Sequence, residues 1–179
     1  SDGQLVVMDR MEHLRQLKGG RKFSPEYMEM RFRFSPYIKD VLVVGGEDED
    51  YIVAIITIDI DNVGRWAEAR KIPYTTFTDL SQKPEVIELM RKETVKVNKA
   101  LPEWMYVKKF CNLHRELDPD EAELTRTRKL RRSFVEERFQ ELTNALYGDK
   151  DELVVEAPIT YRDGRKGTIK SAIKIITME

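Results

Sequence analysis

Three runs of apolar residues predict the strands of a small sheet. Val41–Val44 and Tyr51–Ile60 are separated only by an acidic turn that begins with two glycines. Two apolar runs joined by a short polar turn indicate an antiparallel pair. Met105–Leu113 predicts a third strand, and the β-branched run Gln4–Asp9 predicts a short one near the start of the chain.

Helical spacing of apolar residues predicts four helices around these strands. Ser24 and the proline after it begin a helix that ends before Ser35, since serine caps and proline suits the first turn. Further helices are expected over 63–70, from Pro84 to about 101, and over 133–146. This order predicts an α+β fold with a small mixed or antiparallel sheet packed against helices.

The C-terminal segment predicts a β-hairpin that follows this arrangement, and the sequence leaves open whether it packs on this domain, on another domain or on another subunit. Val154–Arg162 and Arg165–Ile176 flank Asp163 and a glycine, a pair typical of a type I′ turn. We therefore divide the chain into a domain over residues 1–148 and a hairpin extension over residues 149–179. Another short β-hairpin is expected before the main sheet, around a glycine pair at positions 19 and 20.

Composition indicates a folded domain with a core. The chain has 179 residues, of which 41% are hydrophobic and 35% charged, which is the balance of a globular protein. No apolar run approaches the roughly 20 residues that a membrane span needs. The start, Ser1–Gln4, is polar and lacks a methionine, which indicates a fragment of a longer protein.

Cysteine and histidine usage favours neither a disulfide nor a metal site. Cys111 is the single cysteine and sits in an apolar run, so we expect a buried structural thiol. The two histidines, His13 and His114, have no cluster of Cys or His neighbours, so no metal site is expected. One unpaired cysteine suits a reducing compartment, and we expect a cytoplasmic protein.

The most informative stretch is the basic segment Glu123–Arg132. Alternating hydroxyls at Thr125 and Thr127 precede Lys129, and a predicted helix follows directly. A lysine on a loop beside a helix start can approach a phosphate as a point charge. A solvated basic loop is the simpler interpretation, because charge runs are usually surface. A nucleic-acid patch is disfavoured by the balance of 31 Lys+Arg against 32 Asp+Glu.

A second basic segment surrounds the glycine pair. Lys18–Lys22 contains Gly19 and Gly20 between cations. Backbone N–H groups around adjacent glycines can approach an anion closely. From the residues alone, however, an ordinary hairpin turn is the preferred interpretation.

Both segments resemble motifs of the AMP-forming acyl-CoA synthetases. Thr125–Arg132 is similar to the family's C-terminal run Thr-x-Thr-Gly-Lys-(aliphatic)-x-Arg, with Arg128 at the position of the usual glycine. Asp9 and Arg10, followed by Lys18–Pro25 and Glu29, resemble the family's hinge and the first loop of its C-terminal domain. These residues occur in the family's order.

Two further stretches resemble the long-chain fatty acyl-CoA synthetases within that family. They are Tyr74–Leu80 and the Val-Asn-x-x-Leu run Val97–Leu101. The resemblance covers about Asp2 to Tyr147. It implies the C-terminal domain of a long-chain fatty acid–CoA ligase, with a hinge segment over residues 8–13.

The resemblance also implies roles for individual residues. Lys129 corresponds to the catalytic lysine of adenylation, Arg10 to the arginine that contacts the AMP ribose, and Glu12 to the hinge position, where the family usually has Asp or Lys. The loop that lines the CoA tunnel for thioester formation corresponds to Lys18, Gly19, Gly20, Arg21 and Lys22. Residues that support the lysine are Thr125, Thr127 and Arg132.

The implied reaction defines cofactors and partners. A fatty acid attacks the α-phosphate of ATP to give acyl-AMP and pyrophosphate, and CoA then takes the acyl group. ATP and Mg²⁺ would bind mainly to an N-terminal adenylation domain outside this chain, with CoA as co-substrate, so the isolated fragment is expected to be inactive. No nucleic acid is expected as a partner, while peripheral membrane association and oligomeric state stay open.

Three other interpretations remain open from the sequence alone. The parent enzyme could be a ligase for another carboxylic acid, such as an aryl acid. The chain could be a non-catalytic binding module that uses Arg126–Arg132 for RNA or a protein. It could also be a structural α+β domain whose basic segment is solvated surface.

Overall fold

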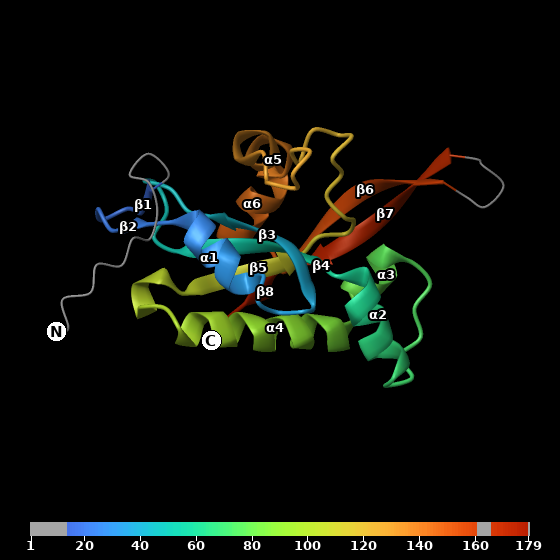
Figure 1. The fold of residues 1–179 in the computed structure, drawn as a ribbon. Coiled ribbons are helices and arrows are strands. Elements are labelled where there is room, and N and C mark those ends of the chain that lie inside the picture. Colours follow the sequence, from blue (N-terminus) through green and yellow to red (C-terminus); the bar gives the residue numbers. More distant parts are fainter. Residues whose placement is uncertain (1–13, 161–165, 179) are drawn as a thin grey trace.

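The computed structural model of the chain describes residues 14–160 and 166–178 (Figure 1). Its central feature is a four-stranded sheet with the order β3-β4-β5-β8. The strands are β3 (Ile38–Val44), β4 (Ile52–Ile58), β5 (Val107–Asn112) and β8 (Ile176–Thr177). β3 and β4 are antiparallel, which confirms the predicted pair.

β4 and β5 pair in parallel, which makes the sheet mixed. A parallel pair needs a long crossover connection. Here the crossover contains α2 (Ile60–Glu68), α3 (Phe77–Ser81) and α4 (Pro84–Lys99), and a short 3₁₀ turn, η2 (Glu103–Met105), precedes β5.

Helices cover both faces of the sheet. In Figure 1, α4 lies below the sheet, and α5 (Arg132–Arg138) and α6 (Gln140–Tyr147) lie above it. The lower core also includes side chains of α1 (Pro25–Phe32) and α2. Every residue of β4 is buried because both of its faces are covered, which explains why its sequence is a continuous apolar run.

Side-chain caps define the starts of several helices. The Ser24 hydroxyl accepts a hydrogen bond of 3.1 Å from the backbone N–H of Tyr27, and Asp59 caps α2 by accepting one of 2.9 Å from Asn62. The first helix was expected to continue to residue 34. It ends at Phe32, and the Phe34 side chain is 76% exposed instead of packed in the core.

The helix expected over 133–146 is interrupted in the structure. α5 and α6 meet at Phe139, whose φ of −103° and ψ of 23° lie outside the helical region. The break turns the chain so that the Phe139 side chain is buried above the sheet. Phe134, in the part of the helix before this break, is 37% exposed.

A β-hairpin lies at each end of the described chain. β1 (Arg15–Gln16) pairs with β2 (Lys22–Phe23) around the glycine pair. β6 (Glu152–Thr160) and β7 (Lys166–Lys174) form an antiparallel ribbon that projects to the right in Figure 1. The turn expected at Asp163 and the strand expected over residues 4–9 lie outside the described residues.

The segment after β7 returns to the central sheet, which the sequence did not predict. β8 pairs with β5, and the N–H of Met178 donates a hydrogen bond of 2.8 Å to the Lys108 carbonyl. Ile173 and Ile175 are buried with the residues of α5 and α6. Among the described helices, none combines the length and apolarity that crossing a bilayer requires.

Candidate functional site

Lys129 is displayed by a tight turn, Leu124–Leu130, which we call the lysine turn. Leu124 and Leu130 form an antiparallel bridge at its base. Within it, the N–H of Thr125 donates to the Lys129 carbonyl over 2.8 Å, and the N–H of Arg128 donates to the Thr125 carbonyl over 2.9 Å. Lys129 is exposed, so a fixed backbone presents its ammonium group to solvent.

The two threonine hydroxyls stabilise the shape of the lysine turn. Thr125 Oγ1 accepts a hydrogen bond of 3.0 Å from the N–H of Lys129. The same hydroxyl lies 3.1 Å from Thr127 Oγ1. Such local bonds from side chain to backbone favour turns over regular structure, and they give the Thr-x-Thr pattern a structural explanation.

Arg128 adopts the left-handed backbone conformation, with a φ of +57°. Glycine adopts this conformation most readily because it lacks a Cβ. The Arg128 side chain reaches Asp40 of β3 at 3.3 Å, and Arg33 lies 3.8 Å from the same carboxylate. Burial raises the pKa of Asp40 above its usual value, although the charges of Arg128 and Arg33 act in the opposite direction.

A buried ion pair fixes the chain immediately after the lysine turn. Arg132 Nη2 donates to Glu29 Oε1 of α1 over 2.6 Å, and Arg132 Nη1 donates to the Val43 carbonyl of β3 over 3.1 Å. Glu29 Oε1 also accepts from the N–H of Val43 over 3.0 Å. Burial raises the pKa of Glu29 despite the nearby positive charge of Arg132. The pair joins α1, β3 and α5 at one point.

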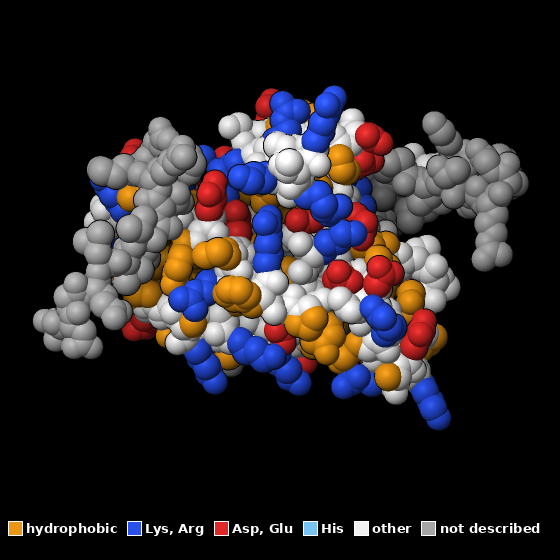
Figure 2. All heavy atoms as spheres, in the orientation of Figure 1, with side chains coloured by type: hydrophobic (Ala, Val, Ile, Leu, Met, Phe, Trp, Pro, Cys, Tyr) orange, Lys and Arg blue, Asp and Glu red, His pale blue; other side chains and the backbone are white. Residues whose placement is uncertain are grey.

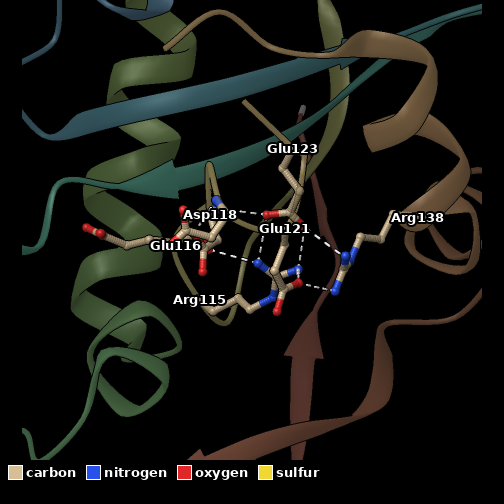
Figure 3. A network of polar contacts seen from close by, with 7 residues as sticks. Arg115, Glu116, Asp118, Glu121, Glu123 and Arg138 are labelled. Atoms are coloured by element: carbon tan, nitrogen blue, oxygen red, sulfur yellow. Dashed lines mark hydrogen bonds and ion pairs between the residues drawn. The ribbon is translucent and has the colours of Figure 1, made fainter. Parts of the chain in front are cut away.

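A second network fixes the chain before the lysine turn (Figure 3). The fully buried Glu123 carboxylate accepts hydrogen bonds from Arg115 Nη1 at 2.9 Å and Nη2 at 2.5 Å, and one of 2.8 Å from the N–H of Asp118. Arg138 of α5 lies 3.1 Å from the same carboxylate and pairs with Glu121. Burial alone would raise the pKa of Glu123, but these hydrogen bonds and the charges of Arg115 and Arg138 lower it.

A third contact ties the same loop to β3. Lys39 Nζ donates to Glu116 Oε1 over 2.8 Å. Together with Arg128 and Arg132, Lys39 connects the long segment between β5 and α5 to one strand. This segment, gold in Figure 1, runs over the top of the domain.

The loop Lys18–Lys22, which we call the glycine loop, is the turn of the β1–β2 hairpin. Gly19 and Gly20 have φ values of +95° and +85°, so both need the backbone freedom of glycine. The N–H of Leu17 donates a hydrogen bond of 2.9 Å to the Arg21 carbonyl. The five loop residues are exposed, and the Arg21 guanidinium lies 5.8 Å from the ring centre of Trp104.

The glycine loop and the lysine turn occupy different parts of the domain. The β1–β2 hairpin lies at the left in Figure 1, whereas the segment that carries the lysine turn lies at the top beside α5. Figure 2 shows Lys and Arg side chains at the centre and top of this face, with acidic side chains among them. Arg10 and Glu12 lie outside the described residues.

Several acidic residues around the site were not predicted to support the lysine turn. Asp40 and Glu123 received no role from the sequence, and Glu29 entered only as part of the motif that resembles the family's first loop. Asp40 directly precedes the apolar run Val41–Val44, and a charged residue in a buried strand requires a partner. That position was the available signal for Asp40. Glu123 and Glu29 meet their partners only through the tertiary fold.

The thiol and metal chemistry of the described residues is limited. Cys111 is buried, and burial raises the pKa of its thiol to about 12, so it remains protonated. Across residues 14–160 and 166–178, no three His, Cys, Asp or Glu side chains come together to hold a metal ion.

Comparisons with known proteins identify the family. Residues 15–151 match the family model described as the AMP-binding enzyme C-terminal domain. A long-chain-fatty-acid–CoA ligase, FadD15, from Mycobacterium tuberculosis is 29% identical over 147 residues, which are 82% of this chain and 24% of the relative. Human long-chain-fatty-acid–CoA ligase 1 is 28% identical over 149 residues, or 82% of this chain and 21% of the relative.

Solved structures show the same fold. The adenylation domain of a carboxylate reductase from Mycobacterium chelonae matches with a TM-score of 0.62 and 21% identity, over 79% of this chain and 20% of that one. The corresponding domain from Segniliparus rugosus, solved with AMP and a co-purified carboxylic acid, matches with a TM-score of 0.60 and 18% identity, over 79% and 21%.

The family model covers most of this chain, while the chain spans about a quarter or less of the curated relatives. The predicted α+β fold is confirmed by the architecture that it shares with the solved adenylation domains. This chain belongs to the C-terminal domain family of the AMP-binding enzymes, a family with fatty-acid–CoA ligases among its members.

Proposed function

We propose that this chain is the C-terminal domain of a cytoplasmic long-chain fatty acid–CoA ligase, and that Lys129 acts in the adenylation step. The supporting observation is the lysine turn itself. Lys129 is exposed, while Arg132 and Glu123 anchor the chain on either side of it in buried ion pairs. A solvated basic loop would not need both of its ends to be fixed in this way.

Adenylation requires a cation at the reacting phosphate. Attack of the fatty-acid carboxylate on the α-phosphate of ATP gathers negative charge at one centre. A protonated lysine next to the phosphate oxygens offsets that charge most effectively in a site that excludes water. In the proposal, Lys129 acts as this electrophile and transfers no proton.

The remainder of the reaction depends on the larger part of the parent protein. ATP with its Mg²⁺, and the fatty acid, bind to the N-terminal adenylation domain, and Arg10 contacts the AMP ribose. CoA then displaces AMP. In this second step, the domain turns about Glu12 and presents the glycine loop in place of the lysine turn. The separate positions of the two loops support this alternation.

The experiment for Lys129 separates the two half-reactions in the full-length parent enzyme. Lys129→Ala is expected to abolish ATP–pyrophosphate exchange driven by a fatty acid, and to retain thioester formation from presynthesised acyl-adenylate. Arg126→Ala is the matched control, because Arg126 is an exposed cation in the same turn. Normal exchange in Lys129→Ala would exclude the assignment and return the segment to a solvated loop.

The glycine loop is tested by the opposite pattern. Gly20→Val places a β-branched residue at a φ of +85°, so the turn must change shape. We expect slower thioester formation with normal pyrophosphate exchange. Gly46→Val, in the turn between β3 and β4, is the control because a Cβ there meets no atom within 4 Å. Equal loss of both half-reactions in Gly20→Val would contradict the role of this loop.

A further inference from the structure

Arg128 holds the chain in a conformation that arginine does not favour. The lysine turn has the geometry of a type I turn at residues 126–127 followed by a left-handed residue, since Arg128 donates to the Thr125 carbonyl and has a φ of +57°. In hairpins of this kind the left-handed position is usually glycine. A side chain at this position costs free energy relative to glycine, and a contact made by that side chain can offset the cost.

Asp40 provides that interaction from the strand beneath. Its side chain is only 5% exposed, and it lies 3.3 Å from Arg128 Nη2. By strand alternation Asp40 shares a face with Leu42, which packs in the same cluster as Leu124 of the turn. The ion pair therefore joins the outer end of the turn to the surface on which its base rests.

A buried carboxylate needs positive charge nearby. Arg33 at 3.8 Å is the other arginine in contact with Asp40 among the described residues, and it approaches from the end of α1. Removal of Arg128 leaves Asp40 with this more distant arginine, and removal of Asp40 leaves the turn without its contact to β3. Each partner consequently depends on the other.

We propose that Arg128 is a positioning residue, whose ion pair with Asp40 holds the lysine turn against β3 and fixes the direction in which Lys129 is presented. This inference rests on the proposed adenylation role of Lys129. A glycine at position 128 would relax the backbone but remove the contact. Arg128 has an unfavourable φ, and its contact with Asp40 orients Lys129.

The test compares variants of the full-length parent enzyme. Arg128→Gly removes the side chain and relieves the backbone, whereas Asp40→Asn removes the partner charge and leaves the turn sequence unchanged. For both, we expect kcat of fatty-acid-driven pyrophosphate exchange to fall about tenfold, which corresponds to about 1.4 kcal/mol. KM for ATP and thioester formation from acyl-adenylate should be unchanged.

Two further measurements distinguish positioning from general destabilisation. Amide hydrogen exchange over residues 124–130 should be faster in both variants, with the rest of the domain unaffected. The double variant should be no slower in adenylation than either single variant, because both changes remove the same contact. Arg126→Gly, which changes an exposed arginine of the same turn, should retain wild-type adenylation.

The outcomes separate this inference from the function on which it rests. If Lys129→Ala loses pyrophosphate exchange while Arg128→Gly keeps normal pyrophosphate exchange, only the positioning role is overturned. An equal fall of both half-reactions in Arg128→Gly, or additive effects in the double variant, also overturns it. Normal exchange in Lys129→Ala overturns the proposed function and the positioning role together. If Asp40→Asn does not fold, Arg128→Gly decides alone.

Discussion

Arg132 and Glu29 form a buried ion pair of 2.6 Å although they are 103 positions apart in the chain. Arg132 begins the helix after the lysine turn, and Glu29 lies on the helix after the glycine loop. The frameworks of the two candidate loops are therefore joined directly. A change at this pair is expected to affect the domain as a whole.

Removal of Arg132 should destabilise the domain strongly. Arg132→Met leaves Glu29, 5% exposed, as an uncompensated buried charge, and breaking such a pair costs about 3–5 kcal/mol. We expect this loss in the free energy of unfolding, measured by urea denaturation at pH 7.

The double variant Arg132→Met/Glu29→Leu provides the control for this prediction. It removes both charges, so it should be more stable than the single variant. In Arg132→Met the cost should also shrink in acid. The raised pKa of Glu29 means that it takes up its proton in the folded state as pH falls. A cost that is equal at pH 4 and pH 7 would contradict the assignment to an unpaired carboxylate.

Substitutions of Glu123 and Glu121 should have very different effects on the free energy of unfolding, although both side chains contact Arg115 and Arg138. Glu123 is fully buried with several donors, whereas the Glu121 side chain is 46% exposed. Glu123→Gln should lower the free energy of unfolding by about 2–3 kcal/mol, as hydrogen bonds to charged groups do. Glu121→Gln should change it by less than about 1 kcal/mol. Chemical denaturation measures both losses. Similar losses in the two variants would show that the strength of this network does not depend on burial.

Glu123 also predicts a loss of stability in acid. Its pKa is lowered in the folded domain, so the unfolded chain binds the proton more readily. The stabilisation by Glu123 is therefore complete above the unfolded value, near 4.5. It is lost as pH falls through the folded pKa, and Glu123→Gln should remove this part of the pH profile.

His114 predicts a second pH dependence at higher pH. Its side chain is buried, and burial with the neighbouring charge of Arg115 lowers its pKa to about 4. The unfolded chain takes up a proton near pH 6.5, so stability should fall between about pH 6.5 and 4, by up to about 3 kcal/mol. In His114→Gln this slope should disappear. An unchanged slope, measured as unfolding midpoints across this range, would show that another group titrates.

The hairpin extension should contribute to stability through the burial of β7 in the core around α5 and α6. Ile173 is fully buried, and Ile173→Ala should cost about 2–5 kcal/mol. Val154 on the paired strand is 58% exposed, so Val154→Ala should change stability by less than about 0.5 kcal/mol. Thermal unfolding of both variants checks this. A small effect of Ile173→Ala would mean that β7 is not part of the cooperative core.

The sequence predicted correctly those elements that can be recognised from consecutive residues. The β4 run is apolar throughout because both of its faces are covered, and the β3–β4 pair follows from the short turn between two such runs. The parallel pairing of β4 with β5 depends on packing of the crossover helices. The break at Phe139 was hidden because apolar spacing continues across it.

Prediction of the site from the sequence was limited in the same way. The lysine turn was recognised because its residues are consecutive, and the structure shows what the threonine hydroxyls do in it. Two of its supports are contacts between residues about 90 to 100 positions apart, Arg128 with Asp40 and Arg132 with Glu29. Local pattern contains no information on such partners. Only the position of Asp40 directly before the apolar run of β3 indicated that it needs a partner.

β4, which is buried at every position, separates two hydrophobic cores. Val53 and Ile55 pack under α5 and α6, while Ala54 and Ile56 face the side of α1 and α4. In evolutionary terms, apolar substitutions above this strand should be compensated by α5 and α6, and those below it by α1 and α4. Positions 53 and 55 should covary with α5 and α6, and positions 54 and 56 with α1 and α4. The ion pair of Arg132 with Glu29 crosses this division, so the side that presents the lysine turn can change its apolar packing separately only while that pair is kept.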